Sequence, residues 1–343
     1  MRLFLLLLVL SPQSGPSWWK VQTSGLDTNL RGVSVVSLKS GPHVVWASGS
    51  KGVILRSTDD GTTWRQLSVE GGSNLDFRDI EAFSADVAYV MSAGNGEQSR
   101  IYKTTDGGQT WKLQYSDKRP GFFLDSLACD SRTHCFALSD PVDGKFLVLA
   151  TDDGEHWQEL PRDNMPPALP NEGAFAASGT AIALCRNGAI YFGTGGPAAR
   201  VFRSTDRGRS WKVFTTPLPA AASSGIFGLT CVGRSKTLAA VGGDYRQPAQ
   251  AGRVAIYSRD GGGTWQLSRQ QPGGFRSAVA SFAKGELVAV GTNGTDMSFD
   301  SGIRWTNTDP LNLNSVAFAG GEGWAVGPRR TIAHFTYLPM RRK

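Results

Sequence analysis

The 343-residue sequence is poor in the residues that build metal and redox sites. It contains only four cysteines and four histidines, and no CxxC pair. Zinc sites usually need such closely spaced ligands, so we expect no metal and no cofactor. A GxSxG motif is also absent, and the glycine-rich stretches at 193–196 and 258–264 do not open a helix after a strand. These absences argue against a nucleophile elbow and against a dinucleotide or phosphate loop.

Charged residues are scarce as well, at 19% of the chain. The formal net charge is +7, but the lysines and arginines are scattered along the sequence rather than gathered in runs. This pattern argues against a nucleic-acid partner, and we interpret residues 339–343 as a solvated basic tail. Glycine, with 42 residues, and tryptophan, with 10, are instead abundant. Such a turn-rich and aromatic-rich composition is typical of a β-rich globular protein.

The apolar run LFLLLLVL, after Met1 and Arg2, is too short to span a bilayer. The order of a positive charge, a short apolar core and the polar stretch SPQSGPS is typical of a secretory signal. We therefore predict a signal peptide at 1–16, a single domain at 17–338, and an extracytoplasmic mature protein without a transmembrane segment. The alternative is an apolar N-terminus of a cytoplasmic protein. No cysteine follows the run, so a lipid anchor is not expected.

Six segments repeat one template built from a hydroxyl residue, aspartate, glycine and tryptophan. They are STDDGTTW (57–64), TTDGGQTW (104–111), ATDDGEHW (150–157), STDRGRSW (204–211), YSRDGGGTW (257–265) and SFDSGIRW (298–305). Their tryptophans recur every 40 to 54 residues. This period is typical of a four-stranded structural unit.

The aspartate of each segment is predicted to be structural. A carboxylate that accepts backbone N–H groups holds a tight turn, glycine supplies the positive φ, and tryptophan covers the turn as it begins the next strand. The predicted turn aspartates are Asp59, Asp106, Asp152, Asp206, Asp260 and Asp300. Because the turn already accounts for each carboxylate, we do not expect these residues to be catalytic.

Seven apolar strand patterns accompany only six such segments. The patterns are GVSVVS, DIEAFS, DSLACD, AIALCR, GLTCVG, SAVASF and SVAFAG. The last pattern has no following segment, whereas WKV at 19–21, after the predicted signal, mirrors WKV at 211–213. We therefore predict an all-β, seven-bladed β-propeller of four-stranded blades, closed by pairing of the N-terminal strand into the last blade. Such closure removes the free edge of a linear array.

The six aspartate segments and the seven-blade count resemble the Asp-box (BNR) propellers. More closely, they resemble the photosystem II stability/assembly factor family of extracytoplasmic seven-bladed propellers. This resemblance implies an exported, non-catalytic scaffold that binds a protein partner. We expect the protein to be a monomer.

Candidate binding residues lie on the face opposite the aspartate turns, because loops on a rigid scaffold carry function. Arg31, Arg78 and Arg276 occupy the same repeat position in blades 1, 2 and 6, and equivalent positions converge on the central channel. Three guanidinium groups would suit an anionic ligand or an acidic peptide segment. The other candidates on this loop face are Asp140, Asp143, Arg200, Asp244 and Tyr245.

Alternatives remain for these arginines. Each could pair with a carboxylate of a neighbouring blade, such as Asp79, Asp125 or Glu172. They could also form a sialidase-like site, a glycoside hydrolase acting on an acidic sugar, together with Tyr245 and Glu172. The sialidase Arg-Ile-Pro signature is absent, however, because the sequence at 31–33 is Arg-Gly-Val. An uncharacterised enzyme in the channel is a further alternative.

The cysteines fall into two groups. Cys129 and Cys135 flank the expected turn DSRTH, and they could pair in an oxidising compartment. Cys185 and Cys231 fall in apolar strands, where we expect buried small residues.

Overall fold

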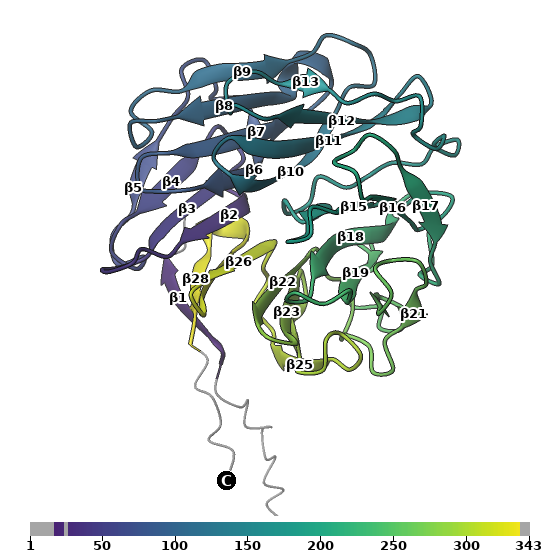
Figure 1. Cartoon of the computed structure of the whole chain (residues 1–343). Coiled ribbons are helices and arrows are strands. Elements are labelled where there is room, and N and C mark those ends of the chain that lie inside the picture. The colour runs from purple at the N-terminus through teal and green to yellow at the C-terminus, as the bar shows by residue number, and fades with distance from the viewer. Residues whose placement is uncertain (1–16, 24–26, 337–343) are drawn as a thin grey trace, which may run out of the picture.

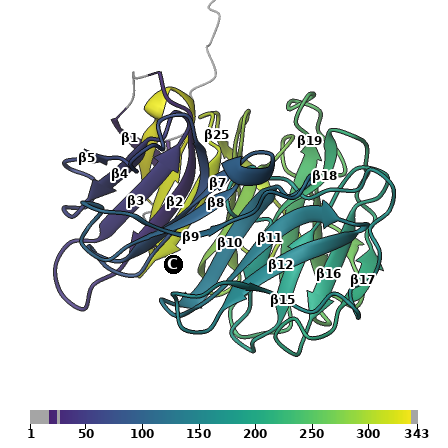
Figure 2. The ribbon, with the colours of Figure 1, turned by 90° about the horizontal axis from the view of Figure 1, so that it is seen from above.

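The computed structural model describes residues 17–23 and 27–336. The predicted signal peptide at 1–16 and the basic tail at 339–343 lie outside the described residues. Within the described part of the chain, the strands form seven four-stranded antiparallel sheets that follow one another round a ring (Figures 1 and 2). The prediction of an all-β, seven-bladed propeller is confirmed. None of the described helices is long and apolar enough to cross a membrane.

Six blades follow the chain order from an inner strand to an outer one. Blades 1 and 2 contain β2 (Leu30–Val36), β3 (Val44–Gly49), β4 (Ile54–Ser57), β5 (Arg65–Leu67), β6 (Asp76–Ala82), β7 (Ala88–Ala93), β8 (Arg100–Thr104) and β9 (Lys112–Ser116). Blades 3 and 4 contain β10 (Leu124–Ser131), β11 (His134–Val142), β12 (Lys145–Thr151), β13 (Gln158–Glu159), β14 (Ile182–Leu184), β15 (Ile190–Gly193), β16 (Arg200–Ser204) and β17 (Lys212–Thr215). Blades 5 and 6 contain β18 (Ser224–Cys231), β19 (Leu238–Asp244), β20 (Ala255–Ser258), β21 (Gln266–Leu267), β22 (Ala278–Ala283), β23 (Glu286–Gly291), β24 (Gly294–Ser298) and β25 (Thr306–Asp309).

Blade 7 is completed by the beginning of the chain, as predicted. It contains β26 (Ser315–Ala319), β27 (Glu322–Val326), β28 (Ile332–Phe335) and β1 (Trp19–Thr23). The antiparallel pairing of β1 with β28 places Trp19 opposite Phe335, and the two strands lie side by side in Figure 1. Two short 3-10 helices, η1 (Gly96–Gln98) and η2 (Pro328–Arg330), lie in loops.

The hydrophobic core lies between neighbouring blades. One cluster packs Trp46 and Ile54 of blade 1 against Phe77 and Val90 of blade 2. Every residue of β3 and β7 is buried. A strand that is covered on both faces has no polar side, so it reads as a continuous apolar run rather than as an alternation.

The aspartate turns follow the third strand of a blade. The Asp59 carboxylate accepts a hydrogen bond from the backbone N–H of Thr63 at 2.9 Å and one from the Ser57 hydroxyl at 2.7 Å. The indole of Trp64 covers the turn and donates to the carbonyl of Gly61 at 3.0 Å. The same bond to the backbone N–H four residues later is made by Asp106, Asp206, Asp260 and Asp300.

Blade 3 departs from the predicted turn at Asp152. Its turn is held by Asp153, which accepts hydrogen bonds from the backbone N–H groups of Glu155 and His156, both at 2.8 Å. The hydroxyl of the turn comes from Thr151, because alanine stands at position 150, and the turn is therefore one residue shorter. The side chain of Asp152 instead lies 3.5 Å from Nε2 of His134. The prediction of Asp152 as the turn carboxylate is wrong.

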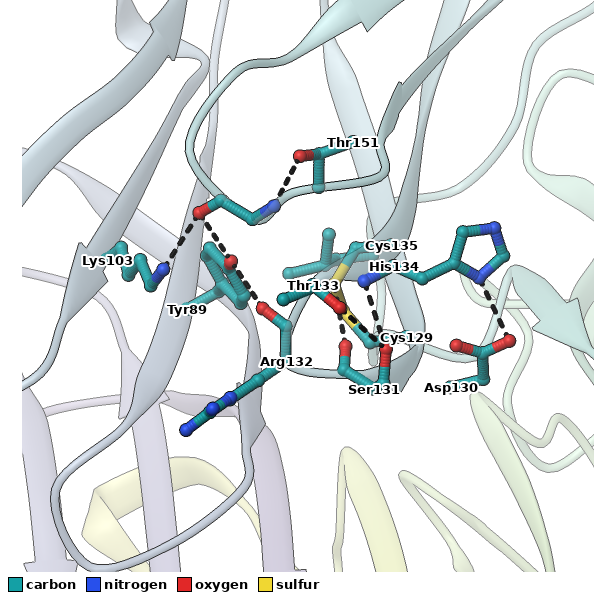
Figure 3. Close-up of a disulfide and its surroundings, with 12 residues drawn as sticks. Tyr89, Lys103, Cys129, Asp130, Ser131, Arg132, Thr133, His134, Cys135 and Thr151 are labelled. Carbon is teal, nitrogen blue, oxygen red and sulfur yellow. Dashed lines mark hydrogen bonds and ion pairs between the residues drawn. A yellow bond between two sulfur atoms is a disulfide. The ribbon is translucent and has the colours of Figure 1, made fainter.

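Two disulfides are present. Cys129–Cys135 joins β10 to β11 within blade 3 (Figure 3). Cys185–Cys231 joins the end of the inner strand of blade 4 to the inner strand of blade 5, where buried free cysteines were expected. A sequence separation of 46 residues concealed this pairing, because neighbouring inner strands meet only once the ring is formed.

Candidate binding site at the channel mouth

A depression of about 510 Å³ lies where the inner strands begin, which we call the channel mouth. Arg31 on β2 and Arg78 on β6 contribute the cationic groups of its lining. Phe175, Phe227 and Tyr245 contribute aromatic rings. The mouth therefore combines two of the three predicted arginines with the predicted tyrosine.

Each of the two guanidinium groups is anchored by hydrogen bonds. Nε of Arg78 donates to a carboxylate oxygen of Asp76 at 2.7 Å, and Nη1 donates to the carbonyl of Ala176 at 2.6 Å. Nε and Nη2 of Arg31 donate to the amide oxygen of Asn29 at 3.1 and 3.0 Å, with that amide turned to satisfy its neighbours. Burial and the charge of Arg78 lower the pKa of Arg31 to about 10. Arg31 therefore remains cationic at neutral pH.

The aromatic side chains form a wall beside these cations. The rings of Phe175 and Phe227 are stacked with their centroids 3.8 Å apart. The ring of Phe227 also packs edge to face against that of Phe275, with centroids 4.7 Å apart. The centroid of the Tyr245 ring lies 6.1 Å from that of Phe227. Tyr245 is 44% exposed, an unusual exposure for so large a ring. The wall offers a flat apolar surface next to two positive charges.

Arg276 does not reach the mouth, and the prediction of three converging guanidinium groups is wrong. Its side chain is fully buried in blade 6, where Nε donates to Asp296 at 2.6 Å. Nη1 donates to the carbonyl of Phe275 at 2.7 Å and to Asn293 at 2.6 Å. A buried charge needs such partners, and they come from the same blade rather than from a ligand.

Arg200 and Glu172 form a second internal ion pair. Arg200 is 9% exposed, and its Nε donates to Glu172 at 2.8 Å. Glu172 is itself buried and also accepts from the hydroxyl of Thr194 at 2.6 Å. Because Glu172 is engaged in this way and Arg276 is buried, the structure does not assemble the arginine trio and the tyrosine–glutamate pair of a sialidase-like site.

The remaining candidates lie in or at the ends of strands on the same loop face. Asp143 is exposed in the turn between β11 and β12, and its backbone has a φ of 54°. A carboxylate oxygen of Asp244 accepts from the N–H of Arg246 at 2.9 Å. Asp140 accepts from the N–H of Ala174 at 2.9 Å. These contacts shape loops, and none of the three residues contributes to the lining of the mouth.

Asp125, which the sequence suggested only as an ion-pair partner, is a buried carboxyl group near Arg78. Asp125 is 1% exposed, and neither of its carboxyl oxygens has a hydrogen-bond partner in the described part of the chain. Burial raises its pKa, as does the neighbouring Asp140, while Arg78 lowers it. Burial also raises the pKa of Asp140 to about 6. Burial thus favours the neutral form of both carboxyl groups more than it does in an exposed aspartate.

Solved structures share the architecture over most of the chain. A structure of YCF48 bound to D1 peptide has 15% identity and a TM-score of 0.66, covering 95% of this chain and 99% of that chain. YCF48 from Cyanidioschyzon merolae has 16% identity and a TM-score of 0.64, covering 93% and 99%. The GH74 xyloglucanase from Xanthomonas campestris has 19% identity and a TM-score of 0.62, covering 93% of this chain and 53% of that chain. At such identities the likeness shows the fold alone.

A curated xyloglucanase of Paenibacillus sp is 25% identical over 243 residues, which is 62% of this chain. The chain spans only 23% of the length of that protein. The family described as the DUF6242 beta propeller domain matches residues 15–284. Since this match covers most of the sequence, the chain belongs to the DUF6242 beta-propeller family.

Proposed function

We propose that the chain is an exported, non-catalytic scaffold that binds a peptide segment of a protein partner at the channel mouth. The observation that carries the proposal is the placement of Arg31 and Arg78 beside the exposed Tyr245 and the stacked pair of Phe175 and Phe227. Guanidinium groups pair bidentately with carboxylates, and exposed aromatic rings are the anchors that dominate protein interfaces. A peptide with an acidic group next to an apolar side chain fits both features.

The similar proteins support a peptide ligand. The YCF48 structure described as bound to D1 peptide matches this chain over nearly the full length of both. The aspartate turns support membership among the Asp-box (BNR) propellers, and the blade count supports likeness to the photosystem II stability/assembly factors. We extend the binding of a protein segment, rather than any particular partner, from those proteins to this chain.

Export is supported by the two disulfides. Disulfides form and persist in oxidising compartments and are rare in the cytosol of most organisms. Both pairs, Cys129–Cys135 and Cys185–Cys231, are closed in the structure. We propose a periplasmic or secreted protein that acts as a monomer after removal of residues 1–16.

The experiment is a quantitative pull-down with the mature protein as bait. The double variant Arg31→Glu/Arg78→Glu should reduce capture of a specific partner by roughly tenfold or more, because reversed charges repel the acidic group. Arg65→Glu, an exposed arginine on β5, is the matched control and should capture the partner as the wild type does. Arg276 stays unchanged, since its reversal would disrupt the buried pair with Asp296. Equal capture by the double variant would overturn the proposal.

A glycoside hydrolase is the second candidate, favoured by the sequence match to the Paenibacillus xyloglucanase. The raised pKa values of Asp125 and Asp140 are what a general acid requires. Purified protein should be assayed with xyloglucan and with a fluorogenic sialoside. Turnover that is abolished by Asp125→Asn would replace the scaffold proposal with an enzymatic one, whereas no turnover on either substrate supports the scaffold.

A further inference from the structure

A second basic site lies on the opposite face of the ring. Arg186, Arg207 and Arg234 line a depression of about 1170 Å³, which we call the basic depression. They lie in the turn between β14 and β15, in the aspartate turn after β16, and in the turn between β18 and β19. The lining lies where the inner strands of blades 3 to 5 and the third strand of blade 4 end, whereas the channel mouth lies where the inner strands begin. The fold thus gathers arginines that are scattered in the sequence.

The three guanidinium groups are exposed and not neutralised. Within residues 17–23 and 27–336, no carboxylate lies within 4.0 Å of any of them, and none donates a hydrogen bond to a protein group. The same turns also carry the exposed Arg209 and Lys236. Unpaired cations that share one depression repel one another, so an anionic ligand would relieve this repulsion.

Asp130 also contributes to the lining of the basic depression. It lies in the end of β10, and Nδ1 of His134 approaches its carboxylate at 2.9 Å (Figure 3). The side chain is therefore partly engaged on the protein side, and it opposes rather than assists an anionic ligand. Removing the negative charge of Asp130 should therefore strengthen the binding of an anion if that binding is electrostatic.

The backbone conformation at Arg207 suits glycine better than arginine. Its φ is 60°, in the left-handed region that disfavours residues with a Cβ atom. The equivalent turn position in blades 2 and 5 is glycine, at Gly107 and Gly261, with φ values of 74° and 76°. Asp60 and Ser301 stand there in blades 1 and 6, and such short polar side chains tolerate this conformation better than arginine does. The chain keeps a guanidinium where glycine would be less strained.

We infer that the basic depression binds an acidic peptide segment independently of the channel mouth. Its lining contains no aromatic residue, so it lacks the stacking surface that sugars and nucleic-acid bases use. Carboxylates on a flexible chain can reach three guanidinium groups in one concave site and pair with them bidentately. Cys129 and Cys185, one cysteine of each disulfide, contribute to the lining of the depression. The two cross-links make this side of the site rigid before binding.

The test is fluorescence anisotropy of a labelled hexaglutamate peptide with the full chain. Binding should be measured in the wild type and in Arg31→Gln/Arg78→Gln, which disables the mouth. In both backgrounds Arg207→Gly should weaken binding by roughly two- to fivefold, the range of an exposed ion pair. This variant keeps the fold, because glycine suits the φ of position 207. Asp130→Asn should tighten binding by a similar factor, which a purely structural effect would not do.

Several outcomes would overturn the inference. One is that Arg31→Gln/Arg78→Gln removes all binding, since the acidic peptide would then use only the mouth. Another is equal binding of a hexaglutamine peptide. A third is that inorganic phosphate competes as well as unlabelled hexaglutamate, which would assign the site to a phosphate-bearing ligand. Arg65→Gln, across the ring on β5, is the control and should not change the affinity.

Discussion

Single carboxylates decide how firmly each aspartate turn is held. Hydrogen bonds from the side chain and the backbone N–H of Thr110 lower the pKa of Asp106 to about 2. The backbone N–H of Thr264 makes the largest favourable contribution at Asp260, whose pKa is also lowered to about 2. An aspartate in the unfolded chain has a pKa of about 4. The stabilisation of the folded state by these ionised carboxylates is therefore fully present above that pH and is lost as the pH falls through about 2. The turns therefore favour the folded state throughout the neutral range.

The register of the turn in blade 3 gives a matched pair of variants. Asp153→Ala should lower the melting temperature by several degrees, because the N–H groups of Glu155 and His156 lose their acceptor. Asp152→Ala should leave it nearly unchanged, since Asp152 is exposed and makes no bond within the turn. Thermal unfolding followed by circular dichroism at neutral pH separates the two. Equal effects would mean that the turn uses both aspartates.

At the scale of elements, one buried carboxyl connects two blades. Asp79 on β6 accepts from the backbone N–H of Leu127 on β10 at 2.6 Å and from that of Ile80 at 2.8 Å. Burial raises the pKa of Asp79 to about 7, and burial together with Asp79 raises that of Glu81 on the same strand. The ionised form is thus disfavoured in the folded state. Its cost is absent below about pH 4, the unfolded value, and grows as the pH rises toward 7.

The consequence is a loss of stability from weakly acidic to weakly alkaline pH. The wild type should melt at a lower temperature at about pH 8 than at about pH 5. Asp79→Asn should narrow that difference, because the amide does not ionise while its oxygen can still accept from Leu127. Asp59→Asn, in an exposed turn, is the control and should leave the difference as it is in the wild type, since burial does not oppose its charge. An unchanged difference in Asp79→Asn would contradict the assignment.

The two disulfides should differ in their effect on stability. Their sequence separations are 46 residues for Cys185–Cys231 and 6 residues for Cys129–Cys135. Loop-closure entropy predicts losses of about 4 and about 2 kcal/mol, respectively, when each pair is replaced by alanine. Denaturant unfolding of the two double variants measures both values. A larger loss at Cys129–Cys135 would show that the loop-entropy argument fails here.

At the scale of the whole molecule, the ring is held closed by β1. Trp19 is 4% exposed and packs against Phe335 of β28, with ring centroids 5.2 Å apart. Its indole also donates to the hydroxyl of Thr295 in blade 6, at 2.9 Å. One residue thus links the beginning of the chain to the last blade and to the blade before it.

Trp19→Ala should therefore destabilise the protein by about 3–5 kcal/mol, the usual cost of truncating a buried aromatic side chain. Val21→Ala on the same strand should change stability by less than about 0.5 kcal/mol, because Val21 is 47% exposed. Guanidinium chloride unfolding of both variants is the measurement. If the two losses were similar, closure by β1 would not be a main source of stability.

Much of the architecture could be predicted from local patterns. The turn aspartates, the glycines and the tryptophans act within a few residues of one another, so their spacing revealed the blades directly. The prediction of Asp152 fails because the alanine at position 150 cannot supply the turn hydroxyl, so the turn begins one residue later, at Thr151. Cys185–Cys231 was missed because its partners meet only across neighbouring blades.

The sequence by itself determined the number of blades, the order of their strands and the closure through WKV at 19–21, because each depends on short-range patterns that repeat. Only the tertiary structure decided which arginines are available to a ligand. Arg31 and Arg276 occupy equivalent positions, yet Arg276 is buried against Asp296 while Arg31 lines the mouth. The gathering of Arg186, Arg207 and Arg234 was likewise hidden, since exposure and charge neutralisation depend on strands that are distant in sequence.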